Sequence, residues 1–353
     1  MRFAYFSAAL TTFALSLVFS IGLGLSQTRA YVIEDHRNYT WPGDSSILRI
    51  ISTADVNVFE PIIVEFQRSY PGITVDYTIV SSTELMTALY EEGASFDLAI
   101  SSAMDLQTKL ANDGFAQSYR SDATDALPKW ASWRGQVFAF TQEPAVLVIS
   151  EAAFEGMELP RTREDVITLL RDNPERFSGR IGTYDVRISG AGYLFATQDS
   201  RNTDSYWRLT EVMGRLNAQL YGGSDEMITD VASGRLALAY NVVGSYAASR
   251  LADSPGIRIL QYDDFLNVML RSVLIPVTAQ NPRGAGLMID FLATLDTRAG
   301  LERLTNLTPV KSDLYATNSA SRPIRLGPGL LVFLDQLKKE IFLRNWANAI
   351  EQQ

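Results

Sequence analysis

Small hydroxyl side chains gather at three points where a short apolar run of the chain gives way to a polar one. Each group follows a strand-like stretch and precedes a helix-like one: Ser52 and Thr53; Ser81, Ser82 and Thr83; Ser101 and Ser102. Hydroxyls both donate and accept hydrogen bonds, and the first amides of a helix point outward without partners. Such groups suit the non-covalent binding of a small polar or anionic solute. At any single position, the hydroxyl can instead serve only as a helix cap.

Two later loops carry residues of the same kind. The first holds Arg187 and then five residues that fit around an oxyanion: Ser189, Gly190, Ala191, Gly192 and Tyr193. The second loop offers Asn241, Ser245 and Tyr246 as polar contacts. A guanidinium can bind a phosphate or carboxylate with two hydrogen bonds, so we expect Arg187→Ala to weaken an anionic ligand by about 1.5–3 kcal/mol. The alternatives are a surface ion pair, a plain tight turn, and core packing of the two tyrosines.

The residue types that most hydrolases and zinc sites need are scarce. The sequence has no cysteine and one histidine, His36, which lies in a polar stretch. Thiolate chemistry, disulfides, Ser–His hydrolysis and histidine-ligated zinc therefore lose their usual groups. The adjacent acids Asp263 and Asp264 would point to opposite sides of an extended segment, so a shared catalytic site there is not expected. We expect a binding protein with no cofactor or metal, rather than an enzyme.

The N-terminal residues predict export. A single cation, Arg2, precedes an apolar stretch from Phe3 to about Leu25, and Thr28 and Ala30 provide small residues for cleavage. We predict that residues 1–30 are a signal peptide, cleaved after Ala30, and that the protein works in the periplasm. The alternative is an uncleaved membrane anchor. The formal net charge of −9 argues against binding of nucleic acid or of an anionic membrane surface.

Strand-like and helix-like stretches alternate after a polar lead-in at residues 31–46, which we expect to be loosely held. Strand patterns cover 47–51, 73–79 and 96–100, and helical spacing follows each of them. Three such units predict a largely parallel sheet, in which ligands bind beyond the carboxyl ends of the strands. The hydroxyl groups should therefore meet at one edge of the sheet.

The second half of the sequence continues the alternation. The apolar runs at 137–140 and 145–149 are expected to cross from one part of the protein to another. Helices are expected at 162–170 and 207–220, with Ser224 capping a short one, and strands at 180–184 and 236–240. A strand at 268–277 should return to the first part, and amphipathic helices at 287–295 and 330–349 should complete it.

Four stretches carry a resemblance to a known family: Ile181–Tyr193, Tyr240–Tyr246, Ile275–Pro276 with Ile289–Leu292, and Thr308–Val310. In their order and spacing they resemble the periplasmic solute-binding proteins of ABC transporters, in the subfamily that includes the ferric-ion-binding proteins. Within it, the sequence is most similar to the phosphoglycerate transport regulatory proteins. The resemblance extends from Ile47 to about Thr317.

The resemblance implies an α/β protein with the type II periplasmic binding protein fold. Each of its two lobes would be a mostly parallel sheet flanked by helices, and two crossing segments would form the hinge. The first lobe would comprise residues 47–142 and 272–353, and the second 143–271. A small anionic solute, such as an organophosphate or a carboxylate, would close the lobes. The implied partner is a membrane permease, or alternatively a sensor kinase, and we expect a monomer.

Ferric-ion binding is the alternative within the same family. The ferric branch holds its metal with neighbouring tyrosines in the region of Asn241–Tyr246. Here Ser245 precedes Tyr246, so Tyr240 would have to supply the second phenolate. Because iron needs several hard anionic ligands close together, the sequence favours an organic anion.

Overall fold

The computed structural model describes residues 31–43, 45–298, 300–316 and 318–352. The predicted signal peptide and its cleavage site lie outside these residues. Within them, no helix combines the length and the apolar character needed to cross a membrane. Residues 31–353 form one compact unit.

The first lobe is built on three parallel strands, β2 (Ser46–Ser52), β3 (Ile73–Ile79) and β4 (Leu98–Ser101). Helices α1 (Val56–Ser69), α2 (Ser82–Met86) and α3 (Met104–Asn112) follow them, and a π-helical turn, Thr87–Glu91, extends α2. The expected loose lead-in instead contains a strand, β1 (Asp35–Tyr39), which pairs antiparallel with β3. Its polar residues gave no period-two apolar signal, because it lies at the edge of the sheet with one partner.

The second lobe also contains three parallel strands, β8 (Ile181–Tyr184), β9 (Gln219–Tyr221) and β10 (Leu238–Val243). Its helices are α5 (Arg163–Asp172), α7 (Gly190–Asn202), α8 (Ser205–Arg215), α9 (Ser224–Ala232) and α10 (Gly244–Arg250). The expected helix at 207–220 was too long. Asn217 has a left-handed backbone (φ 52°), which ends the helical run and allows β9 to pair with β8.

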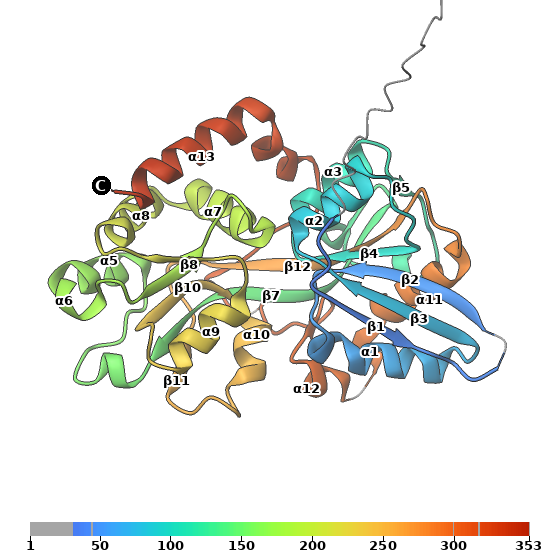
Figure 1. Ribbon diagram of the computed structural model, residues 1–353, viewed down its shortest axis with the longest axis horizontal. Coiled ribbons are helices and arrows are strands. Elements are labelled where there is room, and N and C mark those ends of the chain that lie inside the picture. Colours follow the sequence, from blue (N-terminus) through green and yellow to red (C-terminus); the bar gives the residue numbers. More distant parts are fainter. Residues whose placement is uncertain (1–30, 44, 299, 317, 353) are drawn as a thin grey trace, which may run out of the picture. The chain divides into compact units, whose positions relative to one another are not determined.

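Two long strands join the lobes, as Figure 1 shows. β7 (Val137–Ser150) and β12 (Leu266–Pro276) pair with each other from Val268↔Pro144 to Val273↔Phe138. β12 continues the first sheet through β4, and β7 continues the second through β10 and β11 (Ile257–Leu260). The expected α/β fold with two lobes and two crossing segments is therefore confirmed.

The C-terminal segment connects both lobes along a further path. After α11 (Pro282–Ala293) and α12 (Leu301–Thr305), a 3₁₀ segment, η5 (Pro328–Leu334), packs on α3 of the first lobe. The last helix, α13 (Gln336–Ile350), was expected to complete the first lobe. Instead, its residues Phe342 and Trp346 are buried in a cluster with Leu209 and Met213 of α8. By its contacts, α13 belongs to the second lobe.

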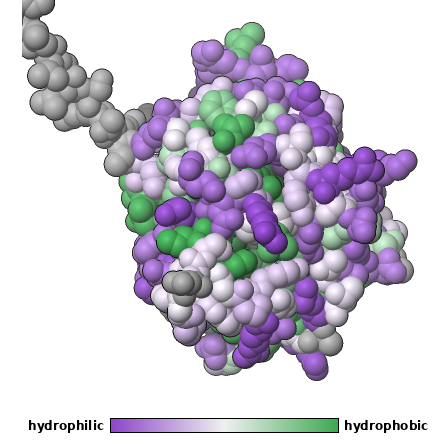
Figure 2. All heavy atoms as spheres, turned by 90° about the vertical axis from the view of Figure 1, so that its right-hand side faces the viewer, coloured by the Kyte–Doolittle hydropathy of each residue, from purple (hydrophilic) through white to green (hydrophobic). Residues whose placement is uncertain are grey.

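Short elements complete the chain: β5 (Ala116–Gln117), α4 (Asp122–Asp125), η2 (Lys129–Ala131), β6 (Ser132–Trp133), η3 (Ala152–Phe154), α6 (Pro174–Phe177), η4 (Leu295–Thr297), β13 (Thr308–Pro309) and β14 (Ser321–Pro323). Figure 2 shows the end of the molecule formed by the first lobe. Hydrophilic residues cover most of this face, and apolar residues appear on it in small separate patches.

Candidate functional site

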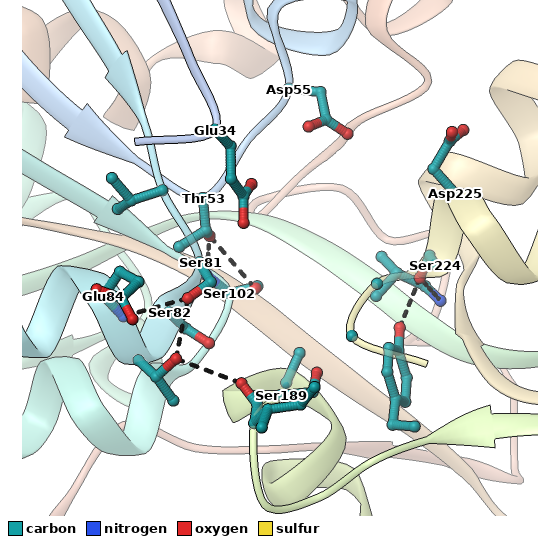
Figure 3. Close-up of a pocket in the computed structure, with 18 of the residues that line it drawn as sticks. Glu34, Thr53, Asp55, Ser81, Ser82, Glu84, Ser102, Ser189, Ser224 and Asp225 are labelled. Atoms are coloured by element: carbon teal, nitrogen blue, oxygen red, sulfur yellow. Dashed lines mark hydrogen bonds between the residues drawn. The ribbon is translucent and has the colours of Figure 1, made fainter. Parts of the chain in front are cut away.

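A cavity of about 590 Å³ lies between the lobes, where their parallel strands end. Segments that follow all six of these strands line it: Thr53 and Asp55 after β2, Ser81–Glu84 after β3, Ser102 after β4, Ile188, Ser189 and Ala191 after β8, Gly222–Glu226 after β9, and Tyr246 after β10. Figure 3 shows the labelled hydroxyl and carboxylate side chains around this space. The volume falls within the range of small-molecule sites in proteins.

The first-lobe wall contains five of the expected hydroxyl residues: Thr53, Ser81, Ser82, Thr83 and Ser102. Some of their hydrogen-bonding capacity is used within the wall. The amide of Ser102 donates to Thr53 Oγ1 at 3.2 Å, and the amide of Glu84 donates to Ser81 Oγ at 3.2 Å. Each hydroxyl oxygen can make further hydrogen bonds, so the wall combines helix capping with the capacity to bind a solute.

Ser52 and Ser101 do not line the cavity. Both are fully buried, and their hydroxyls serve the turns that follow their strands. Ser52 Oγ accepts from the Ala54 amide at 3.0 Å, and Ser101 Oγ accepts from the Ala103 amide at 3.1 Å. Successive side chains of an extended segment point to opposite sides, which puts Thr53 and Ser102 on the open side and their neighbours inside.

The second-lobe wall includes Ser189, Ala191 and Tyr246 of the expected residues. Ser189 caps α7, since its Oγ accepts from the Gly192 amide at 3.2 Å. Gly190 lies beside the cavity, and its amide donates to Ser82 Oγ of the first lobe at 3.0 Å. Two further hydrogen bonds join the lobes: Thr83 Oγ1 donates to the Ile188 carbonyl at 3.3 Å, and the Asp55 amide donates to Tyr246 Oη at 3.4 Å.

Arg187 lies outside the cavity lining, and its donors are already in use. Its guanidinium donates to Asp185 at 2.7 and 2.8 Å and to Glu351 at 2.6 Å. These interactions with Asp185 and Glu351 raise the pKa of the guanidinium. The geometry therefore corresponds to the surface ion pair named above as the alternative, rather than to an anion-binding arginine.

Asn241 and Tyr240 belong to a buried polar cluster of the second lobe. Asp199 accepts hydrogen bonds from Asn241 Nδ2 at 2.7 Å, from Tyr240 Oη at 2.8 Å and from Arg163 at 3.1 Å. Neither Asn241 nor Tyr240 lines the cavity. Tyr240 and Tyr246 therefore do not face one common site, and the described residues contain no group of three or more histidine, aspartate and glutamate side chains that could hold a metal.

Three other expected residues also have structural roles. Ser245 donates to Glu143, and Tyr193 Oη donates to the Phe333 carbonyl at 2.5 Å. Gly192 packs against Tyr184, where a Cβ atom would come within 2.3 Å of the tyrosine Cβ. The hydroxyls of Ser245 and Tyr193 therefore make hydrogen bonds within the protein, and the absence of a side chain at Gly192 allows close packing.

Arg271, which the sequence analysis did not single out as a ligand contact, lines the cavity from β12. Its side chain is 1% exposed and donates to Glu143 from Nε at 2.9 Å and from Nη2 at 3.1 Å. The third nitrogen, Nη1, is buried and has no partner within the described part of the chain. A buried donor without a partner costs free energy, which a bound acceptor would recover.

Five carboxylate residues also line the cavity: Glu34, Asp55, Glu84, Asp225 and Glu226. Burial raises the pKa of Asp55, although Tyr246 and Arg271 oppose this effect. Burial and then the nearby acids, Asp55 first, raise the pKa of Glu34. Asp55 precedes α1, as a capping residue would, but its side chain makes no capping hydrogen bond. Its carboxylate has the Tyr246 hydroxyl as a side-chain hydrogen-bond partner, and within the described ranges it forms no salt bridge.

The loop before α9 supplies a part of the site that the sequence analysis missed. Gly223, not Ser224, occupies the capping position of α9. Ser224 Oγ instead bonds with Tyr184 Oη at 2.5 Å and accepts from the Val243 amide at 3.1 Å. The only sequence signal for this loop is the Gly222–Gly223 pair, a dipeptide that is typical of turns.

Comparisons with known proteins agree with this architecture. The family model described as bacterial extracellular solute-binding protein matches residues 48–303. A substrate-binding protein of an ABC transporter from Agrobacterium tumefaciens is 30% identical, with a TM-score of 0.85, over 91% of this chain and 99% of that one. A search of curated proteins gives no match.

Two more distant solved structures share the fold. AfuA from Actinobacillus pleuropneumoniae, solved with fructose-6-phosphate bound, is 14% identical, with a TM-score of 0.69, over 88% of this chain and all (100%) of that one. Iron-bound HitA from Pseudomonas aeruginosa is 16% identical, with a TM-score of 0.66, over 86% of this chain and 99% of that one.

Proposed function

The chain belongs to the bacterial extracellular solute-binding protein family, and from this premise we propose that it captures a small organic anion between its lobes. The solute would be an organophosphate or a carboxylate, passed on to the permease of an ABC transporter. We also propose that the protein works in the periplasm as a monomer, after cleavage at Ala30.

The observation that carries this proposal is that Arg271, which lines a cavity rich in hydroxyls, has a buried Nη1 without a hydrogen-bond partner among the described residues. A charge-assisted hydrogen bond from this nitrogen to an oxyanion would be among the stronger contacts available in the cavity. Thr53 and Ser102 lie in the same lining, together with Ala191 in the first turn of α7 and Ser224–Glu226 in the first turn of α9. All these groups bind a solute and leave its covalent bonds unchanged.

The protein would select its solute through closure of the lobes. We propose that residues 47–142 with 272–334 move as the first lobe, and 143–271 with α13 as the second. A solute in the cavity contacts both lobes only when they are together, so its binding favours the closed arrangement. The hydrogen bond from Gly190 to Ser82 and the one from Thr83 to Ile188 would form in the same step.

Organic anions are favoured over ferric ion by the placement of the tyrosines. Tyr240 Oη is taken up by Asp199 and Arg163 in the second-lobe core, which leaves Tyr246 as the tyrosine of the expected pair at the cavity. The bound sugar phosphate of AfuA is an example of an organic anion held by this fold.

A thermal-unfolding screen of residues 31–353 tests the proposal. The panel comprises 3-phosphoglycerate, glycerol 3-phosphate, fructose 6-phosphate, succinate, citrate, inorganic phosphate and ferric citrate. A ligand at about a thousandfold its Kd adds roughly 4 kcal/mol of stability. We expect an organic anion to raise the melting temperature of the wild type and of Arg187→Ala, but much less that of Arg271→Lys. A shift with ferric citrate alone, or with no compound, would contradict the proposal.

A further inference from the structure

The lining of the cavity contains charges of both signs. Arg271 enters from β12, while Glu34, Asp55, Asp225 and Glu226 come from both lobes. In Figure 3, Glu34 and Asp55 lie on one side of the cavity and Asp225 lies across from them, on α9. A solute that bound through its oxyanion alone would meet these carboxylates with a like charge.

Protein cations compensate only part of this acidic lining. Arg271 is already paired with Glu143, and Asp225 is paired with Arg250 at 2.7 Å. Within the described ranges, Glu34, Asp55 and Glu226 form no salt bridge with a lysine, arginine or histidine. Glu34 also lies close enough to Asp55, Glu84 and Glu226 for their charges to raise its pKa. The acidic side of the cavity therefore lacks a cation, while Nη1 of Arg271 lacks an acceptor.

One small molecule can supply both missing groups. We infer that the solute is a small zwitterion, whose oxyanion accepts from Arg271 and whose ammonium group donates to Asp55 and Glu34. This inference rests on the proposed function and specifies the solute of that same site. An ammonium is favoured over a hydroxyl because it neutralises the repulsion among the carboxylates, whereas a hydroxyl only donates a hydrogen bond.

Tyr246 indicates that the two charges of the solute are close together. Its Oη accepts from the Asp55 amide at 3.4 Å, and its ring lies 5.9 Å from the Arg271 guanidinium carbon. Asp55 and the guanidinium of Arg271 therefore both lie next to one tyrosine side chain. A short linker between ammonium and oxyanion fits this arrangement.

Calorimetric titration of matched compounds tests the inference. The phosphate series is O-phosphoethanolamine, 2-hydroxyethyl phosphate and ethyl phosphate, which differ only in an ammonium, a hydroxyl or a hydrogen at one end. The carboxylate series is β-alanine, 3-hydroxypropionate and propionate. In at least one series, we expect the ammonium compound to bind at least tenfold more tightly than both analogues.

Variants then test which residues recognise the ammonium. Asp55→Asn and Glu34→Gln should each reduce the preference for the ammonium compound and leave the affinity for the analogues without an ammonium unchanged or stronger. Glu340→Gln on the exposed face of α13 is the matched control and should keep the full preference. A preference that survives in the Asp55→Asn/Glu34→Gln double variant would overturn the assignment of these carboxylates.

The same titrations separate this inference from the proposed function. If the anions bind in either series but the ammonium gives no advantage, the zwitterion inference is wrong and the anion receptor stands. If no compound of either series or of the thermal screen binds, both are wrong.

Discussion

Two arginines illustrate how the surroundings of a side chain determine its role. Arg187 is exposed enough to meet a solute, but Asp185 and Glu351 occupy its donors, and it lies outside the cavity lining. Arg271 is buried in a strand and paired with Glu143, yet its Nη1 has no partner among the residues that the structure describes. The buried arginine is therefore the better candidate to bind an anion.

We expect Arg187→Ala to leave the affinity for an anionic solute unchanged. The substitution removes ion pairs at a partly exposed site, where each contributes at most about 1 kcal/mol of stability. Calorimetric titration of the variant beside the wild type is the measurement. A loss of affinity of tenfold or more would return Arg187 to the binding site.

The Arg271–Glu143 pair should behave as a unit in folding. Arg271→Met leaves a buried carboxylate without its cation, which typically costs about 3–5 kcal/mol. The double variant Arg271→Met/Glu143→Met removes both charges and should recover most of this loss, as measured by urea unfolding. Both variants should lose affinity for the anion. Anion binding that persists in the stable double variant would exclude Arg271 from the site.

Asp105 should make stability depend on pH. It is buried in the first turn of α3, its Oδ1 has no partner in the described chain, and burial raises its pKa from 3.8 to about 7. A folded-state pKa above the unfolded value means that protonation stabilises the fold below about pH 4, by up to roughly 4 kcal/mol, and that this contribution is lost as the pH rises to about 7.

Urea unfolding at pH 4, 5.5, 7 and 8.5 measures the effect of Asp105. In the wild type, the free energy of unfolding should fall between pH 4 and 7. We expect this fall to be smaller in Asp105→Asn, and we expect the variant to be more stable than the wild type at pH 8.5. Glu158→Gln, at an exposed acid, is the control and should follow the wild-type curve. If the free energy of unfolding changed equally with pH in Asp105→Asn and in the wild type, Asp105 would be ionised in the folded protein.

At the scale of elements, the starts of helices bring the lobes together. Gly190 begins α7, and a Cβ atom there would lie 2.4 Å from Ser82 Oγ and 3.0 Å from Ala103 Cβ of the first lobe. The serine hydroxyl can rotate away, but the alanine Cβ is fixed to the backbone. Only glycine therefore permits this approach of the two lobes.

Gly190→Ala should weaken solute binding at least tenfold without destabilising the protein. Alanine favours the helix, so α7 remains formed while closure is obstructed. Gly329→Ala is the matched control, because a Cβ atom there meets no atom within 4 Å. Titration and urea unfolding of both variants provide the readout. A normal affinity in Gly190→Ala would show that closure does not require this contact.

The sequence predicted most accurately those features that depend on residues close together in the chain. Period-two patterns located β3, and hydroxyls after the strands identified Thr53, Ser81–Thr83 and Ser102 as cavity residues. Arg271 and Glu34 could not be found this way, because strand pairing and lobe packing bring them to the cavity from distant parts of the chain. Asn241 was misassigned because its partner, Asp199, lies 42 residues away in sequence.

At the scale of the molecule, the connections between lobes determine how they can move. β7 and β12 pair across the junction, and the C-terminal segment adds a further link from α3 to α8. Such a hinge permits a change of angle while both sheets stay intact. The central claim of our account is that a solute shifts the lobes toward the closed arrangement.

The most direct test is the distance between spin labels on the two lobes. Because the chain has no cysteine, Arg68→Cys on α1 and Thr229→Cys on α9 give two unique and exposed attachment sites. We expect saturating O-phosphoethanolamine or 3-phosphoglycerate to convert a broad distance distribution into a narrower and shorter one, but not in Gly190→Ala. Bound solute with an unchanged distribution in the wild type would contradict the account.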